Sequence, residues 1–236
     1  MDRETLRNYI KLGVTFVGAI CLGVSLLYLP SASRSWGFLL MLILSVLVLP
    51  RMSLAIPRSE VAVSFSDTLV FLSFLLYGPA PAIILSGTET LANCYYNKWK
   101  GNIKFREYMI AANVSIGAIS TTLACVSWYL TAKVLNLDQY PTSTNSLIAT
   151  LGVIALMQFV CGTMIVAAFH SIGRGVAFWK TWKKDCFSSS MTQIVGAGVA
   201  GTFYEIISFG DLITMFVALA TFGVVYFMTC ADISAL

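Results

Sequence analysis

Residues 62–93 read AVSFSDTLVFLSFLLYGPAPAIILSGTETLAN, and the way this stretch crosses a membrane decides the fold of the chain. As one helix it would be about 48 Å long, against a hydrocarbon core of about 30 Å. Gly78-Pro79-Ala80-Pro81 lies at its centre, and two prolines and a glycine favour a turn or a sharp break. The stretch therefore predicts two short arms, 62–77 and 79–93, that form a helical hairpin.

The rest of the chain alternates long apolar runs with short charged stretches. Hydrophobic residues make up 58% of the 236 residues and charged residues 11%, which is more apolar surface than a soluble domain of this length can bury. The runs 12–29, 108–132, 147–169 and 212–230 have the length and apolarity of membrane-spanning helices. We expect an integral protein of the lipid bilayer whose first run is kept as a helix, with a cleaved signal peptide as the minor alternative.

Basic residues indicate how the segments are oriented. If the hairpin crosses twice, 13 of the 15 Lys and Arg lie on one side, and only Arg34 and Lys133 lie on the other. A single crossing divides them 9 to 6. Because basic loops stay in the cytoplasm, the larger asymmetry favours the hairpin and puts both termini inside. A re-entrant pair of short arms is the alternative.

We therefore predict an all-α integral membrane helical bundle that forms a single polytopic domain over residues 1–236. About eight segments are expected, at 10–29, 36–50, 62–77, 79–93, 108–134, 147–170, 189–208 and 211–230. Seven crossings would follow if the hairpin were one kinked helix. Residues 52–66 alternate apolar and polar side chains around Ile56-Pro57-Arg58, which predicts a small extended hairpin at the surface.

The motifs of common enzymes are absent from the sequence. It holds one histidine, His170, and has no P-loop, no G-x-G-x-x-G and no H-E-x-x-H. Its six cysteines are scattered without C-x-x-C spacing. We expect no enzymatic activity, no metal and no other cofactor. The basic clusters border apolar runs, so they indicate membrane orientation and predict no nucleic-acid partner.

Polar groups inside apolar segments are the candidates for a binding site. Carboxylates are costly in lipid and usually face a protein interior or a water-filled cavity. Asp67 could simply cap a helix, and buried amides most often bond neighbouring helices. Glu89 has polar neighbours one turn away at Ser86 and Asn93. We predict that a ligand-binding pocket near the broken segment is lined by Asp67, Thr68, Glu89, Asn113 and Gln158, with Glu89 reading the ligand.

A smooth glycine face marks the segment 189–208. Gly196, Gly198 and Gly201 allow close approach of another helix. Such faces usually pack within the same chain, and a homodimer seam is the alternative use.

The hairpin also resembles a known family. Val63-Ser-Phe-Ser-Asp67-Thr-Leu-Val-Phe71 and Leu75-Leu-Tyr-Gly78-Pro79-Ala-Pro-Ala82 are similar to the MASE-type membrane-associated sensor regions of bacterial cyclic-di-GMP signalling proteins. A second similarity covers Leu156-Met-Gln-Phe159, Phe169-His-Ser-Ile172 and Phe178-Trp179-Lys180. The resemblance implies a sensory input domain in the inner membrane, crossing it several times. Its last helix would pass a signal to a cytoplasmic GGDEF or HD-GYP output domain, in cis or in trans.

A weaker resemblance links the hairpin to the substrate-binding S-components of energy-coupling-factor vitamin transporters. They carry a comparable Phe-Ser-Asp and Gly-Pro pattern, but this chain has two helices before the hairpin where they have one. This resemblance implies the alternative function of a solute-binding membrane subunit.

Overall fold

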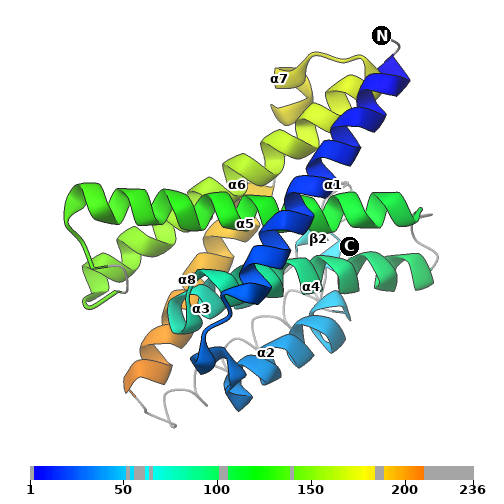
Figure 1. Ribbon diagram of the computed structural model, residues 1–236. Helices are drawn as coiled ribbons and strands as arrows, with labels where there is room; N and C mark the ends of the chain where they lie inside the picture. Colours follow the sequence, from blue (N-terminus) through cyan, green and yellow to red (C-terminus); the bar gives the residue numbers. More distant parts are fainter. Residues whose placement is uncertain are drawn as a thin grey trace, which may run out of the picture.

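The computed structural model describes residues 3–51, 54–55, 62–63, 66–100, 106–138, 141–183 and 189–209. This part of the chain is a helical bundle built around α5, Glu107–Leu135, which crosses the middle of the molecule (Figure 1). Helix α5 packs against α1 (Arg3–Leu27), α4 (Pro79–Trp99) and α6 (Thr144–Arg174). Three long helices thus meet on one central helix.

The shorter elements complete the bundle around α4. Helix α3, Ser66–Tyr77, packs against α4 and α8, and α2 packs against α4. The remaining bounds are η1 Ser31–Arg34, α2 Trp36–Leu47, η2 Leu49–Arg51, α7 Phe178–Thr181 and α8 Ser189–Phe209. The all-helical bundle expected from the sequence is therefore confirmed for the described residues, apart from one small strand pair.

That strand pair matches the extended hairpin predicted over residues 52–66. Strand β1 is Leu54–Ala55 and β2 is Ala62–Val63, and they pair antiparallel with Leu54 opposite Val63. The predicted segment 62–77 is consequently wrong at its start, since the helix begins only at Ser66. Residues 62 and 63 belong to the alternating pattern of the strand pair instead.

Seven of the predicted segments coincide with helices, and the segment 211–230 lies outside the described residues. The segment 79–93 ends too early, because α4 continues to Trp99. Residues 94–99 contain neither glycine nor proline, so nothing in the sequence stops the helix before Gly101. Cys94 and Asn97 are therefore part of α4.

The chain breaks at Gly78, as the Gly-Pro sequence predicts. Helix α3 ends at Tyr77, α4 begins at Pro79, and Gly78 has φ 91° and ψ −169°. Asp67 and Glu89, each eleven residues from Gly78, line the same cavity. A continuous helix would hold them about 33 Å apart, so the two arms must fold back toward each other.

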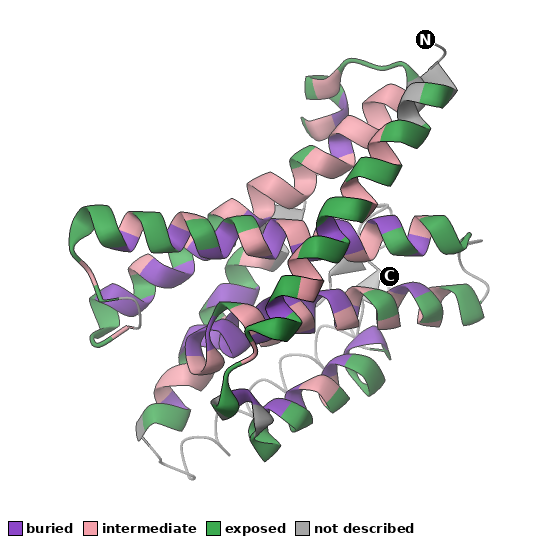
Figure 2. Cartoon of the chain, viewed as in Figure 1, coloured by how far each residue is buried: buried purple, intermediate pink, exposed green. Residues whose placement is uncertain are grey.

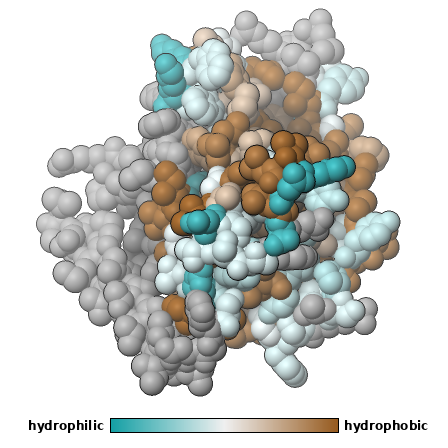
Figure 3. Space-filling model, turned by 90° about the vertical axis from the view of Figure 1, so that its left-hand side faces the viewer, coloured by the Kyte–Doolittle hydropathy of each residue, from teal (hydrophilic) through white to brown (hydrophobic). Residues whose placement is uncertain are grey.

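Three helical stretches of the described chain are long and apolar enough to cross a membrane: Asn8–Leu27, Glu107–Leu135 and Thr144–Ile172. Apolar side chains on α1 are widely exposed (Figure 2), among them Leu12 at 68% and Phe16 at 67%. Another face of the molecule likewise shows apolar residues at the surface beside hydrophilic ones (Figure 3). Large exposed apolar surfaces of this kind suit a lipid environment.

Candidate functional site

A cavity of about 470 Å³ lies among α3, α4, α5, α6 and α8. Its volume falls in the range of small-molecule sites, roughly 300–1,000 Å³. The lining is rich in amide, hydroxyl and carboxyl groups, contributed by Asp67, Ser86, Glu89, Thr90, Asn93, Asn97, Asn113, Ser120, Gln158, Thr163 and Gln193. Polar groups converge here inside an otherwise apolar bundle.

Four of the five residues predicted for a site lie in this cavity: Asp67, Glu89, Asn113 and Gln158. Thr68 does not line it. Its side chain is buried, and a Cβ placed on Gly196 of α8 would lie 3.4 Å from the Thr68 hydroxyl oxygen. Helix α8 thus covers Thr68, a contact that its sequence position could not reveal.

Asp67 joins three helices at one end of the cavity. The amide Nε2 of Gln158 on α6 donates to Asp67 Oδ1 at 2.9 Å. Gln193 Nε2 on α8 donates to Asp67 Oδ2 at 2.6 Å. Both carboxylate oxygens therefore accept a bond from another helix, so Asp67 ties α3 to α6 and α8 in addition to its place in the first turn of α3.

The same two bonds determine how the glutamine amides are turned. A carboxylate accepts hydrogen bonds, so each amide presents its NH₂ to Asp67 and turns its carbonyl oxygen elsewhere. Gln158 Oε1 and Gln193 Oε1 are both buried and have no hydrogen-bond partner in the described part of the molecule. Each such orphan acceptor costs about 1–3 kcal/mol. Both side chains belong to the lining of the cavity, so these unpaired acceptors are buried in its wall.

Glu89 belongs to a polar stripe along α4, as its sequence neighbours predict. Only 5% of the residue is exposed, and Asn93 Nδ2 donates to Glu89 Oε1 at 3.2 Å. One turn further on, Asn97 Nδ2 donates to the Asn93 carbonyl at 2.9 Å. Ser86 also lines the cavity, so this face of α4 is polar over three turns.

Helix α5 forms the opposite wall and approaches α4 closely. A Cβ built on Gly117 would lie 2.9 Å from Thr90 Oγ1 and 3.2 Å from Ser86 Oγ. Asn113 Nδ2 lies 3.6 Å from Cys94 Sγ, a weak hydrogen bond between the two helices. Gly117 therefore allows the walls of the cavity to meet.

Helix α6 links the cavity to the segment that follows it. Thr163 and Phe159 line the cavity. The indole Nε1 of Trp182, just after α7, donates to Thr163 Oγ1 at 3.0 Å. The Phe159 and Trp182 ring centroids lie 6.2 Å apart. The loop predicted to face the cytoplasm thus contacts the cavity wall directly.

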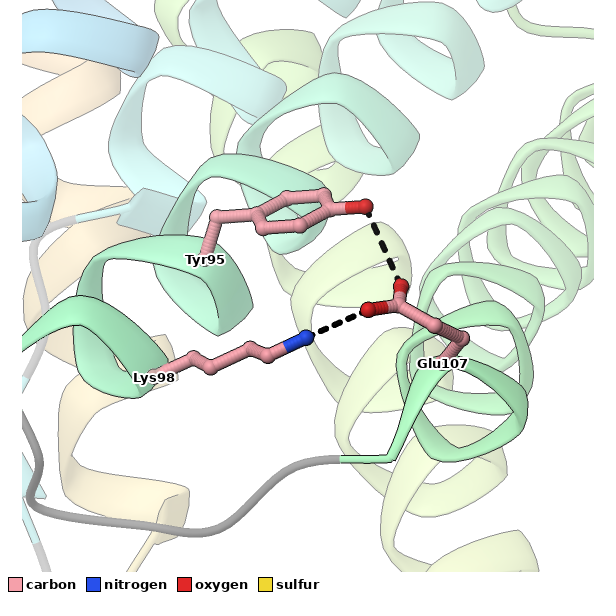
Figure 4. A network of polar contacts seen from close by, with 3 residues as sticks. All are labelled: Tyr95, Lys98 and Glu107. Carbon is pink, nitrogen blue, oxygen red and sulfur yellow. Dashed lines mark hydrogen bonds and ion pairs between the residues drawn. The ribbon is translucent and has the colours of Figure 1, made fainter.

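A second polar cluster links the end of α4 to the start of α5 (Figure 4). Lys98 and Tyr95 of α4 bind the two carboxylate oxygens of Glu107, Lys98 through an ion pair and Tyr95 through a 3.2 Å hydrogen bond. The hydrogen bond to Glu107 raises the pKa of Lys98, which lies beyond the predicted segment 79–93. These groups are solvent-exposed, so the contacts between the two helix ends add little stability.

Sequence reasoning missed several lining residues, including Thr90, Asn97 and Thr163. It did not assign Gln193 to the pocket either. The helical spacing of Ser86, Glu89, Asn93 and Asn97 was the signal that could have extended the stripe. The pairing of Gln193 with Asp67 spans 126 residues, and no local pattern encodes it.

Comparisons with protein families, with curated proteins and with solved structures found no match to this chain. Among the described residues, no group of three or more His, Cys, Asp or Glu could hold a metal ion. Every described lining residue with an ordinarily charged side chain is a carboxylate, and none is Lys, Arg or His. The geometry is suited to binding a small polar molecule.

Proposed function

We propose that this protein is a membrane-embedded sensory domain that binds a small polar molecule in the cavity among α3, α4, α5, α6 and α8. The observation that supports this proposal is the convergence of polar side chains from five helices on one cavity in a membrane-compatible bundle. Polar groups are expensive at membrane depth, and binding is a common reason to retain them.

The position of the cavity supports sensing over solute uptake. Most of its residues come from the second half of α4, the first half of α5 and the second half of α6. These are the helix halves next to the basic loops 94–107 and 171–187. By the positive-inside rule they lie toward the cytoplasm. A transporter subunit of the S-component kind must take its solute from the opposite side, so the cavity suits an internal ligand better.

The signal would leave through the segments that touch the cavity. Trp182 contacts the α6 wall, and α8 is bound to Asp67 through Gln193. A ligand that changes these contacts would shift α8 and the predicted last helix, 211–230. The output domain in this proposal is a cytoplasmic GGDEF or HD-GYP domain, in cis or in trans, with a homodimer as the expected assembly of such domains. The membrane is the bacterial inner membrane.

Filling the cavity tests the proposed function. Gly162 lines the cavity, and a Cβ there would lie 3.6 Å from Ser120 Cβ, an ordinary contact. Gly162→Leu is expected to leave a folded protein whose cavity is blocked. In a thermal-unfolding screen of polar small molecules, compounds that raise the Tm of the parent should lose this effect in Gly162→Leu. When the chain is fused to a diguanylate cyclase, the same variant should lose the response to those compounds.

Gly152→Leu is the matched control, because Gly152 lies on the same helix with no atom within 4 Å of a Cβ. It should respond like the parent. If Gly162→Leu keeps the full ligand-induced rise in Tm, or if no polar compound stabilises the parent, the cavity is not a sensory site.

Reporter fusions test the orientation on which this proposal relies. Fusions after residue 5 and after residue 236 should both give a cytoplasmic signal, because 13 of 15 basic residues then lie inside. A cysteine introduced at Ala80, beside the break, should react with a membrane-impermeant thiol reagent from the periplasm. A periplasmic signal from the first fusion would restore a single kinked helix over 62–93.

A further inference from the structure

The acceptors around Asp67 suggest which chemical class the cavity binds. Gln158 is 6% exposed, lines the cavity and carries a carbonyl oxygen without a partner in the described residues. Gln193 carries a second one on the neighbouring helix. Asp67 holds both amides by their NH₂ groups, which leaves both buried carbonyls without a described partner in the cavity wall. The cluster presents acceptors and one formal negative charge.

We infer that the cavity binds a small organic cation that donates N–H hydrogen bonds, an ammonium or guanidinium ion. This inference rests on the proposed function and specifies its ligand. A bound N–H donor would satisfy the two buried carbonyls, and its charge would lie near the Asp67 carboxylate. An anion would instead meet a carboxylate and two carbonyl oxygens, which repel it.

The volume and the rest of the lining support an organic ion. A cavity of about 470 Å³ is much larger than a bare alkali-metal ion needs. Phe159, Ile116 and Val166 provide apolar wall for a carbon skeleton. Glu89 lines the same cavity from α4 and adds a second carboxylate to the lining. The carboxylates thus suit the N–H donors of the ligand, and the apolar wall suits its carbon skeleton.

A series of four-carbon probes separates the features of this ligand class. Butylamine and butylguanidine carry charge and N–H donors, butyltrimethylammonium carries charge alone, 1-butanol is neutral and butyrate is anionic. At constant ionic strength, only the first two should raise the Tm of the purified full chain, by about 3 °C at ten times their Kd. Sodium chloride exchanged for potassium chloride should have no effect.

Variants then test whether the rise in Tm depends on Asp67, Gln158 and Gln193. Asp67→Asn removes the charge and Gln158→Leu removes one carbonyl, so each should abolish the rise in Tm. Asp138→Asn is the matched control, since Asp138 is exposed three residues after the end of α5 and accepts a hydrogen bond from Thr142 Oγ1. If Gln158→Leu does not fold, Gln193→Met removes the second carbonyl and should have the same consequence.

The outcomes distinguish this inference from the proposed function. If butyrate or 1-butanol stabilises the parent, and Gly162→Leu abolishes that effect, the cavity is a binding site and the cation class is wrong. The class is also wrong if neither butylamine nor butylguanidine raises the Tm, if butyltrimethylammonium matches them, or if Asp67→Asn responds like the parent. The library screen with Gly162→Leu decides the proposed function separately.

Discussion

Gly78→Leu is expected to lower the free energy of unfolding by about 3 kcal/mol or more, because no side chain is tolerated comfortably in that backbone conformation. Gly78 has φ 91° and ψ −169°, a region that is essentially restricted to glycine. The residue is also buried between α3 and α4. A leucine there would strain the backbone and force its side chain into a packed turn.

Thermal or denaturant unfolding in detergent measures this effect, and Gly198→Leu is the control. Gly198 lies within α8 with ordinary helical geometry, is exposed and has no atom within 4 Å of a Cβ. Its substitution should change stability little. If the Gly78 variant retained the stability of the parent, the break between α3 and α4 would not depend on a positive φ.

Gly18→Ala should have the second large effect, because it separates α1 from α5. A Cβ on Gly18 would lie 2.3 Å from Ser115 Cβ and 2.5 Å from Ser115 Cα. The second of these atoms is backbone, so no rotamer change relieves the overlap. The helices must move apart, which also weakens the 3.3 Å hydrogen bond from Ser115 Oγ to the Thr15 carbonyl. We expect a loss of about 2–3 kcal/mol.

Two glycines on the same helix provide the control for α1. Gly13 and Gly23 have no atom within 4 Å of a Cβ. Alanine at either position should be neutral or stabilising, by up to about 1 kcal/mol, because alanine favours a helix more than glycine does. Equal Tm values for the alanine variants at 13, 18 and 23 would show that α1 does not pack on Ser115.

The hairpin was predictable because its signals are local. Gly78 and Pro79 break a helix whatever surrounds them, and apolar length identifies α5 and α6 without knowledge of their neighbours. Helix boundaries were less certain, as the extension of α4 to Trp99 shows. Most of its last six residues are polar or aromatic, so hydropathy assigned them to a loop although they contain no glycine or proline to stop the helix.

The candidate site was predictable only as a list of residues that are costly in lipid. Asp67 and Glu89 stand out from their apolar segments for that reason. Their partners depend on tertiary packing: Gln158 lies 91 residues from Asp67 along the chain, and Gln193 lies 126 residues away. The orientation of each glutamine amide, with its NH₂ bound to Asp67 and its carbonyl unpaired, is seen only once α3, α6 and α8 are packed together.

The bond between Trp182 and the cavity wall gives this protein an intrinsic optical reporter. Indole emission depends on the polarity and hydrogen bonding around the ring, and Trp182 Nε1 is held by Thr163, which faces the cavity. Trp36 and Trp99, by contrast, are 85% and 83% exposed and are not among the residues that line it. The Trp179 ring contacts Trp182, with ring centroids 5.7 Å apart, so these two indoles respond together. A molecule entering the cavity should therefore shift the fluorescence of this pair, so occupancy can be followed in unlabelled protein.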